Sequence, residues 1–212
     1  SRRGDQANHF NEAWKFLEEP ALLNFSKQPQ VRSALIRVAV HDRSSKAIDS
    51  AFTILRSMSH DKQTPSVDCL NALASWCANQ RPSRSSLYYG NTRPQLVEIE
   101  NAMVKGEVKP TPRLLGNLIA GYGMTGDAVS ALGIYRNMKM RGISLNDRDY
   151  VFFLHAISNT AVPTPDAWQL IADPTHLIHG LFKEMQDSRV DITTNILNAA
   201  LRIFTSTLRI SK

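Results

Sequence analysis

Residues 112–146 read PRLLGNLIAGYGMTGDAVSALGIYRNMKMRGISLN, and this stretch predicts one complete helix–turn–helix unit. Apolar residues in its first half recur at spacings of three, four and seven, which is typical of one buried face of a helix. These residues are Leu115, Leu118, Ile119 and Tyr122. The pattern stops at a Gly-Met-Thr-Gly sequence, in which Gly123 and Gly126 are expected to give the backbone the freedom of a tight turn.

The second half of the stretch predicts the partner helix. Its apolar positions are Ala128, Ala131, Leu132, Tyr135 and Met138. We expect this helix to end at Gly142, just after Lys139 and Arg141, because the helix dipole favours cations at that end. A single hairpin cannot bury both of its apolar stripes, so the unit is expected to stack on similar neighbours.

The unit resembles the pentatricopeptide repeat, a helical-hairpin module of similar length. Residues 117–122 stand where the family has Asn-Thr-Leu-Ile-x-Gly-Tyr/Leu, and residues 125–127 match its usual turn. Residues 131–135 match Ala-Leu-x-Leu-Phe/Tyr, and residues 138–146 match the closing Met-x-x-x-Gly-Ile-x-Pro-Asn/Asp. The departure is Leu145, which stands where the family usually has proline.

Weaker copies of the pattern cover nearly the whole chain. We place units at about 31–66, 67–111, 112–146 and 147–192, with partial units at both ends. The resemblance implies an all-α fold for residues 1–212, a right-handed superhelix (solenoid) of stacked helix–turn–helix repeats. No alternating strand pattern and no membrane-length apolar run is present in the sequence. The apolar helix predicted at 193–210 has no partner helix, so we expect either that the natural chain continues or that another protein covers this end. The absence of an initiator methionine also favours a fragment of a longer chain, and a targeting peptide could lie in the missing N-terminus.

Three segments interrupt the repeats. The largest is the insertion QRPSRSSLYYGNTRP at 80–94. It carries three cations, two aromatics and no acid: Arg81, Arg84, Arg93, Tyr88 and Tyr89. Arginine binds phosphate bidentately and tyrosine stacks on unpaired bases, so the insertion is a candidate RNA contact. The alternative is a solvated loop with both tyrosines against the hairpin. A proline-rich segment at 161–174 indicates a structural insertion or a protein contact, and residues 25–30 a short connector.

Composition bounds the possible partners. Lys and Arg number 25 against 19 Asp and Glu, giving a net charge of +6, which suits a phosphate-rich partner. The basic residues are spread along the chain, however, so the charge alone favours nucleic acid only modestly. Cys69 and Cys77 lie too far apart along one predicted helix to bond to each other. They are predicted to be small core residues in a reducing compartment.

No catalytic pattern is present. The sequence contains neither a phosphate loop nor a nucleophile elbow nor a zinc-binding pattern. His176 and His179 lie three apart on a predicted helix, but no further ligand residues accompany them. We therefore predict a protein that is not an enzyme and that needs no metal, cofactor or small-molecule substrate.

The resemblance also implies a way of reading RNA, in which each repeat addresses about one base with two or three side chains. One lies on the first helix and another at the end of the repeat. In the unit at 67–111 these positions are Asn71 and Thr111, which are able to hydrogen-bond to a base edge. In the next unit they are Gly116 and Asn146, and glycine has no side chain with which to read.

The reading positions are not maintained further along the chain. The first-helix position of the unit at 147–192 is Val151, and the matching place in the last, incomplete unit is assigned to Asn195. Recognition by a base code is therefore not expected, and phosphate contacts are. Arg113 and Arg148 open two successive first helices, and together with the arginines of the insertion they are expected to line one edge of the superhelix.

These features, taken with what the resemblance implies, predict a non-catalytic RNA-binding and scaffolding protein of an organellar ribonucleoprotein. In concrete terms it is a mitochondrial ribosome subunit or associated factor, in contact with ribosomal or other structured RNA and with neighbouring proteins. The resemblance implies the mitochondrial matrix, with the plastid as the alternative. Two other functions stay open: a protein-interaction scaffold without RNA, and a sequence-specific organellar transcript-stabilising or translation factor.

Overall fold

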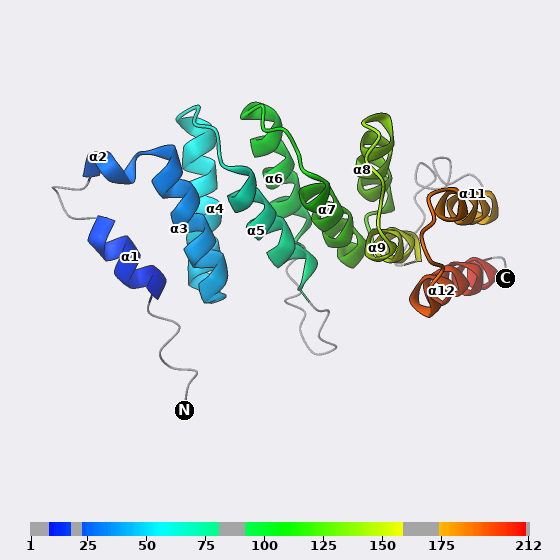
Figure 1. The fold of residues 1–212 in the computed structure, drawn as a ribbon. Coiled ribbons are helices and arrows are strands. Elements are labelled where there is room, and N and C mark those ends of the chain that lie inside the picture. The colour runs from blue at the N-terminus through cyan, green and yellow to red at the C-terminus, as the bar shows by residue number, and fades with distance from the viewer. Residues whose placement is uncertain (1–8, 18–22, 81–91, 159–173, 211–212) are drawn as a thin grey trace. The chain divides into compact units, whose positions relative to one another are not determined.

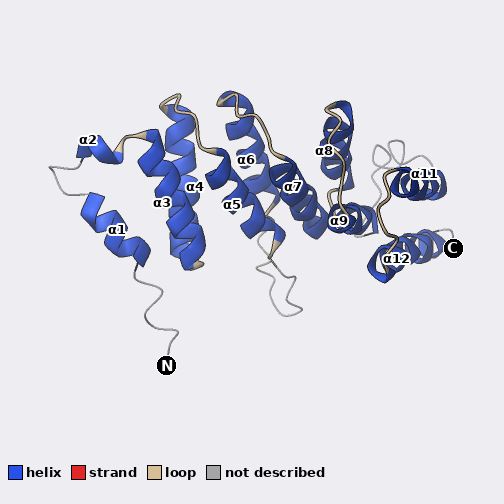
Figure 2. Ribbon diagram, viewed as in Figure 1, coloured by secondary structure: helices blue, strands red, loops and turns tan. Residues whose placement is uncertain are grey.

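A computed structural model of the chain describes residues 9–17, 23–80, 92–158 and 174–210. Every regular element in these ranges is a helix, and none is a strand (Figures 1 and 2). The helices are α1 (His9–Leu17), α2 (Leu23–Ser26), α3 (Pro29–Asp42), α4 (Ser45–His60), α5 (Val67–Ala78), α6 (Arg93–Lys105), α7 (Pro112–Thr125), α8 (Ala128–Met140), α9 (Asp147–Ser158), α11 (Pro174–Asp187) and α12 (Thr194–Ile210). None of them is both long and apolar enough to cross a membrane. The predicted all-α fold is confirmed.

The described residues divide into two compact parts. The first contains residues up to 77 together with 94–114, and the second contains residues 78–93 together with 115–212. In the first part α3 packs against α4, and in the second α9 packs against α8 and α12. The connector predicted at 25–30 is wrong, because α2 and the first turn of α3 occupy most of it.

Four helices, α4, α6, α8 and α11, end in the same way. Shortly after each helix one residue takes a left-handed backbone conformation with φ between 49° and 66°. These residues are Lys62, Glu107, Gly142 and Arg189. The next residue donates its backbone N–H to a methionine carbonyl five positions earlier, at 2.8–2.9 Å. The acceptors are Met58, Met103, Met138 and Met185. This is the Schellman cap, which satisfies carbonyls that a helix end leaves unpaired.

The helix that follows each of these ends also begins in the same way. Four residues after the left-handed position, a side-chain oxygen accepts a hydrogen bond from the backbone N–H three residues further on, at 2.9–3.4 Å. The capping residues are Ser66, Thr111, Asn146 and Thr193. We call each combination of methionine, left-handed residue and N-cap a junction. Its fourfold recurrence shows one local structure that is repeated along the chain.

The four helices that lead into the junctions share a buried pattern as well. Each of these helices carries two aliphatic side chains, seven and four residues before its methionine, so the three residues stand at i, i+3 and i+7. The triplets are Ala51, Ile54 and Met58; Leu96, Ile99 and Met103; Ala131, Ile134 and Met138; and Ile178, Leu181 and Met185. All twelve are buried except Met103, which is half-buried. This spacing places the three side chains on one face of each helix.

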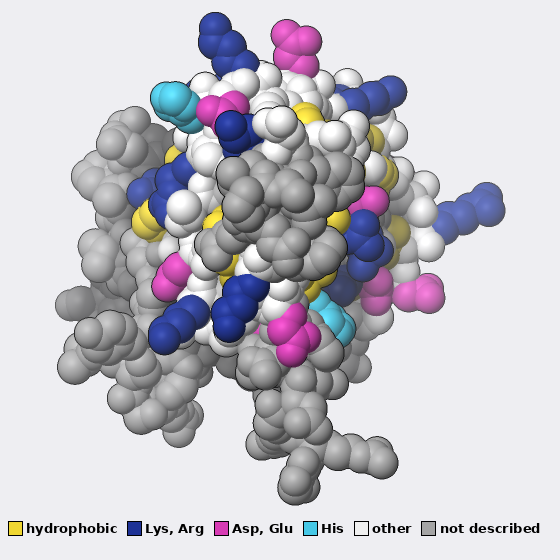
Figure 3. Space-filling view, turned by 90° about the vertical axis from the view of Figure 1, so that its left-hand side faces the viewer, with side chains coloured by type: hydrophobic (Ala, Val, Ile, Leu, Met, Phe, Trp, Pro, Cys, Tyr) yellow, Lys and Arg dark blue, Asp and Glu magenta, His cyan; other side chains and the backbone are white. Residues whose placement is uncertain are grey.

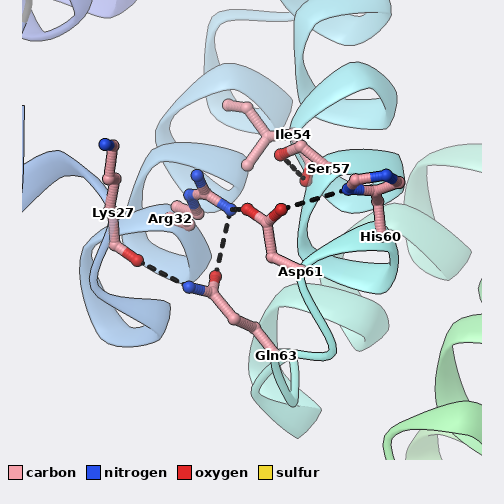
Figure 4. Close-up of polar contacts among 7 residues, drawn as sticks. All are labelled: Lys27, Arg32, Ile54, Ser57, His60, Asp61 and Gln63. Carbon is pink, nitrogen blue, oxygen red and sulfur yellow. Dashed lines mark hydrogen bonds and ion pairs between the residues drawn. The ribbon is translucent and has the colours of Figure 1, made fainter.

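The first junction is further held by a group of polar side chains (Figure 4). Arg32, near the start of α3, donates from Nη1 to Oδ2 of Asp61 at 2.7 Å and to Oε1 of Gln63 at 3.1 Å. Gln63 in turn donates from Nε2 to the carbonyl oxygen of Lys27 at 2.8 Å. The junction after α4 is thereby tied to the beginning of α3.

The central unit confirms most of its predicted core. Leu118, Tyr122 and Leu132 are buried. Tyr135 is only half-buried, and its ring stacks on Phe153 with ring centroids 4.9 Å apart. The apolar pattern at 115–122 therefore identified a helix face that packs inward, as helix periodicity predicts.

The two glycines assigned to the turn after this helix behave differently. Gly126 has a φ of 70° and does form the turn. The prediction for Gly123 is wrong, because this residue lies inside α7, which continues to Thr125. A Cβ atom on Gly123 would come 2.6 Å from the carbonyl oxygen of Phe152 in α9. Gly123 is therefore needed for the close approach of two helices.

Candidate nucleic-acid interface

The two repeat-end positions expected to read a base are both N-caps. Thr111 accepts at Oγ1 from the backbone N–H of Leu114 at 3.3 Å. Asn146 accepts at Oδ1 from the N–H of Asp149 at 2.9 Å, and Oδ2 of Asp149 accepts from the N–H of Asn146 at 3.3 Å. This reciprocal pair has the geometry of a capping box. Both caps are exposed, but the oxygen of each is already engaged by the backbone.

The junctions fix which first-helix positions correspond to one another. Five residues after the N-cap stand Asn71, Gly116, Val151 and Asn198. The assignment of Asn195 was therefore wrong by three residues, because the last cap is Thr193. Asn71 is half-buried on α5, and Asn198 is exposed on α12.

Gly116 has a structural reason to be glycine. A Cβ atom on this residue would come 2.5 Å from Oδ1 of Asp149. The Asp149 carboxyl group is itself buried, and burial raises its pKa, although the N–H of Asn146 and the charge of Arg148 act in the opposite direction. The position in this unit that was expected to read a base therefore lies against the capping carboxyl group of the next unit.

Arg113 and Arg148 occupy equivalent positions, the second residue of α7 and of α9, but their electrostatic surroundings differ. Arg113 is exposed, and the first turn of α7 carries no acidic residue. Arg148 is also exposed, but the first turn of α9 carries Asp147 and Asp149. Its guanidinium carbon lies 5.3 Å from the centroid of the Phe152 ring, within cation–π range. The charge of Arg113 is therefore less compensated within its own helical turn than the charge of Arg148.

Arg93 is not a loop residue with an unpaired charge. It opens α6, and its Nε donates to Oδ2 of Asp127. Asp127 is the N-cap of α8 and also accepts hydrogen bonds from the N–H and hydroxyl of Ser130 at 3.0 and 2.9 Å. Burial alone would raise the pKa of Asp127, but the hydrogen bonds from Ser130 and Arg93 together hold this pKa below its usual value. The insertion itself holds no acidic residue, but Arg93 pairs with an acid outside it, Asp127.

The other four candidates in the insertion, Arg81, Arg84, Tyr88 and Tyr89, lie outside the described residues. On the face drawn in Figure 3, the described Lys and Arg side chains are interspersed with acidic and uncharged ones. They do not gather there into one patch, in agreement with the spread of basic residues along the sequence.

A polar network that the sequence pattern did not reveal joins α8, α9 and α11. Glu184 accepts hydrogen bonds from the hydroxyl groups of Tyr135 at 2.6 Å and Tyr150 at 2.8 Å, and its Oε2 lies 2.7 Å from Nζ of Lys139. Burial alone would raise the pKa of Glu184, but these three donors hold it below its usual value. The pKa values of both tyrosines are raised by burial and by Glu184. Every member is engaged by another, and Glu184 thereby connects α11 to α8 and α9.

Candidate metal ligands do not converge in the part of the chain that the structure describes. It holds no group of three or more His, Cys, Asp or Glu residues placed to bind a metal ion. His176 and His179 are exposed on α11. Cys69 and Cys77 are free and buried, as expected for core residues, and burial raises the Cys77 pKa to about 12. Such a thiol stays protonated and is a poor nucleophile at neutral pH.

No protein-family model matches this chain, and no curated protein is significantly similar to it. The resemblance to the pentatricopeptide repeat therefore depends on the residues at 112–146 and on the weaker copies beside them.

Proposed function

We propose that this chain is a non-catalytic helical-repeat protein of pentatricopeptide type, which binds structured RNA and neighbouring proteins within an organellar ribonucleoprotein. In concrete terms it is a subunit of the mitochondrial ribosome, or a factor bound to it, that contacts the RNA backbone. Its hairpins stack into a right-handed superhelix.

The strongest support is the junction that recurs four times. A repeated hairpin cannot bury its apolar face alone, so repeats of this kind stack and offer an extended surface to macromolecules. The successive junction residues Thr111 and Asn146 delimit the unit that resembles the family most closely. A repeat array also suits a binding function, because successive repeats present equivalent positions along one extended surface.

The described residues favour backbone contacts over base reading. The side-chain oxygens of Thr111 and Asn146 already accept hydrogen bonds as helix caps. The side chains of Gly116 and Val151 have no group that could hydrogen-bond to a base. A net charge of +6 suits phosphate, and Arg113 stands exposed at a helix start without acidic neighbours in the first turn. In this proposal, Arg81 and Arg84 contribute further phosphate contacts. The mitochondrial matrix, with the plastid as alternative, follows from the family resemblance alone.

A protein-interaction scaffold without RNA contact is the second candidate. It is favoured by the surroundings of two of the arginines first assigned to RNA. Arg93 is paired with Asp127, and Arg148 has Asp147 and Asp149 in the same helical turn. Each cation is therefore partly balanced by the protein itself, which weakens its attraction for phosphate.

Sedimentation of an organellar lysate that contains the tagged chain distinguishes these functions. The proposal predicts that the chain sediments with ribosomal particles, that ultraviolet light crosslinks it to ribosomal RNA, and that ribonuclease releases it. Sedimentation with free transcripts would instead support a transcript-specific factor. Sedimentation in a ribonuclease-resistant protein complex, without crosslinking, would overturn the proposal in favour of the scaffold.

A further inference from the structure

Two of the helices that lead into a junction, α8 and α11, carry the same pair of residue types at the same positions. Five residues before the junction methionine each has a glycine, Gly133 in α8 and Gly180 in α11. Two residues before the methionine each has a cation, Arg136 in α8 and Lys183 in α11. All four residues are exposed. We call these four residues the glycine–cation face.

The structure brings α8 and α11 together beside these residues. Glu184 in α11 accepts a hydrogen bond from the Tyr135 hydroxyl at 2.6 Å, and its Oε2 lies 2.7 Å from Nζ of Lys139. Arg136 follows Tyr135 in the chain, and Lys183 precedes Glu184. The two cations are thus the sequence neighbours of two side chains that meet, while both helices turn their buried triplets to another side.

The chain itself gives no packing reason for either glycine of the face. A Cβ atom on Gly133 or Gly180 would meet no described atom within 4 Å. At Gly116 and Gly123, in contrast, a Cβ atom would collide with α9. Glycine stabilises a helix less than alanine does, but it allows a ligand to approach the backbone closely. The two open glycines therefore favour a partner that comes close to the helix backbone.

The charges of the face are not neutralised by the described part of the chain. No ion pair joins Arg136 or Lys183 to another described residue. Of the acids of α11, Glu184 already accepts from three donors, and Asp187 stands one turn after Lys183. Both cations of the face are therefore able to attract an anionic partner.

The same positions differ in the two junction helices of the first compact part. There α4 has Thr53 and Arg56, and Nε of Arg56 lies 3.6 Å from Oε1 of Glu98. In α6 the positions hold Glu98 and Asn101. Among these four helices, an open glycine followed by a cation without an ion pair is confined to α8 and α11.

No apolar strip extends across both helices. Val129 and Met140 are exposed on α8, one on each side of the face. The equivalent positions in α11 hold His176 and Asp187, which are polar. A protein interface buries aromatic or aliphatic anchors at its centre, whereas the features that α8 and α11 share are glycine and positive charge.

We propose that the glycine–cation face binds the sugar–phosphate backbone of base-paired RNA. Arg136 and Lys183 are the phosphate ligands, and the glycines let the backbone come close to both helices. A double-stranded RNA is recognised mainly by its shape and through phosphate and 2′-hydroxyl groups, which are the groups that such a surface can contact. His179, exposed one turn before Lys183, offers a further hydrogen-bonding group.

This inference rests on the proposed function, because it names a further part of the chain that contacts RNA. It can fail while the proposed function stands. Arg81, Arg84 and Arg113, which carry the RNA contact in that proposal, do not belong to the glycine–cation face.

Filter binding of a base-paired RNA hairpin to the whole chain, at several salt concentrations, tests the cations. Arg136→Gln with Lys183→Gln should weaken binding about fivefold or more and make the log–log salt slope shallower by about 1–2, because two phosphate contacts are lost. Arg37→Gln with Lys46→Gln is the matched control. It removes two exposed cations from α3 and α4, outside the face, and should keep the natural slope.

Gly133→Leu with Gly180→Leu tests the close approach. Both added side chains project into open space and leucine is a good helix former, so the unfolding temperature should not fall. Binding of the hairpin should nevertheless weaken about fivefold, because the leucines hold the phosphates away from the cations. A purely structural role of the glycines would not produce this combination.

The possible outcomes separate the inference from the proposed function. If neither double variant changes hairpin binding but replacing Arg81, Arg84 and Arg113 weakens it, the inference is overturned and the proposed function stands. Unchanged binding for all of these variants would overturn both. Poly-glutamate is the competing probe. If it binds as tightly as the hairpin, and Arg136→Gln with Lys183→Gln weakens it equally, the face belongs to an acidic protein and the inference is overturned.

Discussion

Gly123 on α7 lies against the backbone of Phe152 on α9, so closely that a methyl group at position 123 would stand 2.6 Å from the Phe152 carbonyl oxygen. Backbone atoms cannot swing aside as the end of a side chain can. The approach of these two helices therefore depends on the absence of a side chain at this position.

Replacing Gly123 with alanine should lower the free energy of unfolding by about 1–3 kcal/mol, because α7 and α9 must move apart. Gly133→Ala is the matched control. Gly133 is an exposed residue of α8, and a Cβ atom there would meet nothing within 4 Å. This variant should be up to about 1 kcal/mol more stable than the natural chain, since alanine is the better helix former. Chemical denaturation measures both, and a stabilising Gly123→Ala would contradict the close approach.

The cap residues should matter for stability rather than for base selection. Thr111→Ala and Asn146→Ala should each cost about 1 kcal/mol, because each leaves the N–H at the start of a helix without its acceptor. Asn146→Ser keeps an acceptor and should recover most of the loss. Ser144→Ala, an exposed change in the same junction, should stay within about 0.5 kcal/mol of the natural chain. An Asn146→Ala variant of unchanged stability would show that the cap has no energetic role.

The Glu184 network should make the second compact part sensitive to acid. The pKa of Glu184 is held below its ordinary value of 4.5, so the carboxylate stabilises the fold above that pH. This contribution should be lost as the pH falls from about 4.5 through the lower folded-state pKa. At pH 7, Glu184→Gln should cost about 1–3 kcal/mol, since Lys139 loses its anionic partner.

Denaturation at several pH values measures this effect. The difference between the natural chain and Glu184→Gln should shrink once the pH falls below about 4.5. Asp187→Asn, an exposed change on the same helix, should show a much smaller difference at pH 7. A Glu184→Gln difference that stays constant down to pH 3 would argue that the carboxylate charge is unimportant.

The sequence allowed the helices and the apolar faces to be predicted, because both follow from local periodicity. It also contained the signal for the caps: Thr111 and Asn146 each precede an apolar helical run, which is an ordinary helix start. Their assignment to base reading came from the family resemblance, which outweighed that signal.

Contacts between distant residues were beyond such reasoning. Arg93 and Asp127 lie 34 positions apart, and nothing in the spacing of either indicates that they pair. Glu184 meets Tyr135 from 49 positions away. Gly123 was mistaken for a turn residue because turns and close helix contacts both select glycine, and only the neighbour, Phe152, tells them apart.

Asn71 offers a separate test of base reading. It holds the first-helix position of the unit at 67–111, and the equivalent positions in the next two units are Gly116 and Val151. Asn71→Ala should therefore leave the ratio of affinities for RNAs that differ at one base unchanged, as measured by filter binding. A loss confined to one base would show that coded reading survives in this unit, and would favour the transcript-specific factor.

The salt dependence of RNA binding tests the central claim most directly. A base-paired RNA hairpin is titrated at several salt concentrations with the natural chain, with a variant in which Arg81, Arg84 and Arg113 become glutamine, and with Arg93→Gln as the control. Each lost phosphate contact removes a released counterion, so the triple variant should bind more weakly to every hairpin, and its log–log salt slope should be shallower by about 2–3. Arg93→Gln, whose partner is Asp127, should keep the natural slope. Equal affinities and equal slopes for the natural chain and the triple variant would contradict the RNA-backbone account and leave the protein scaffold in its place.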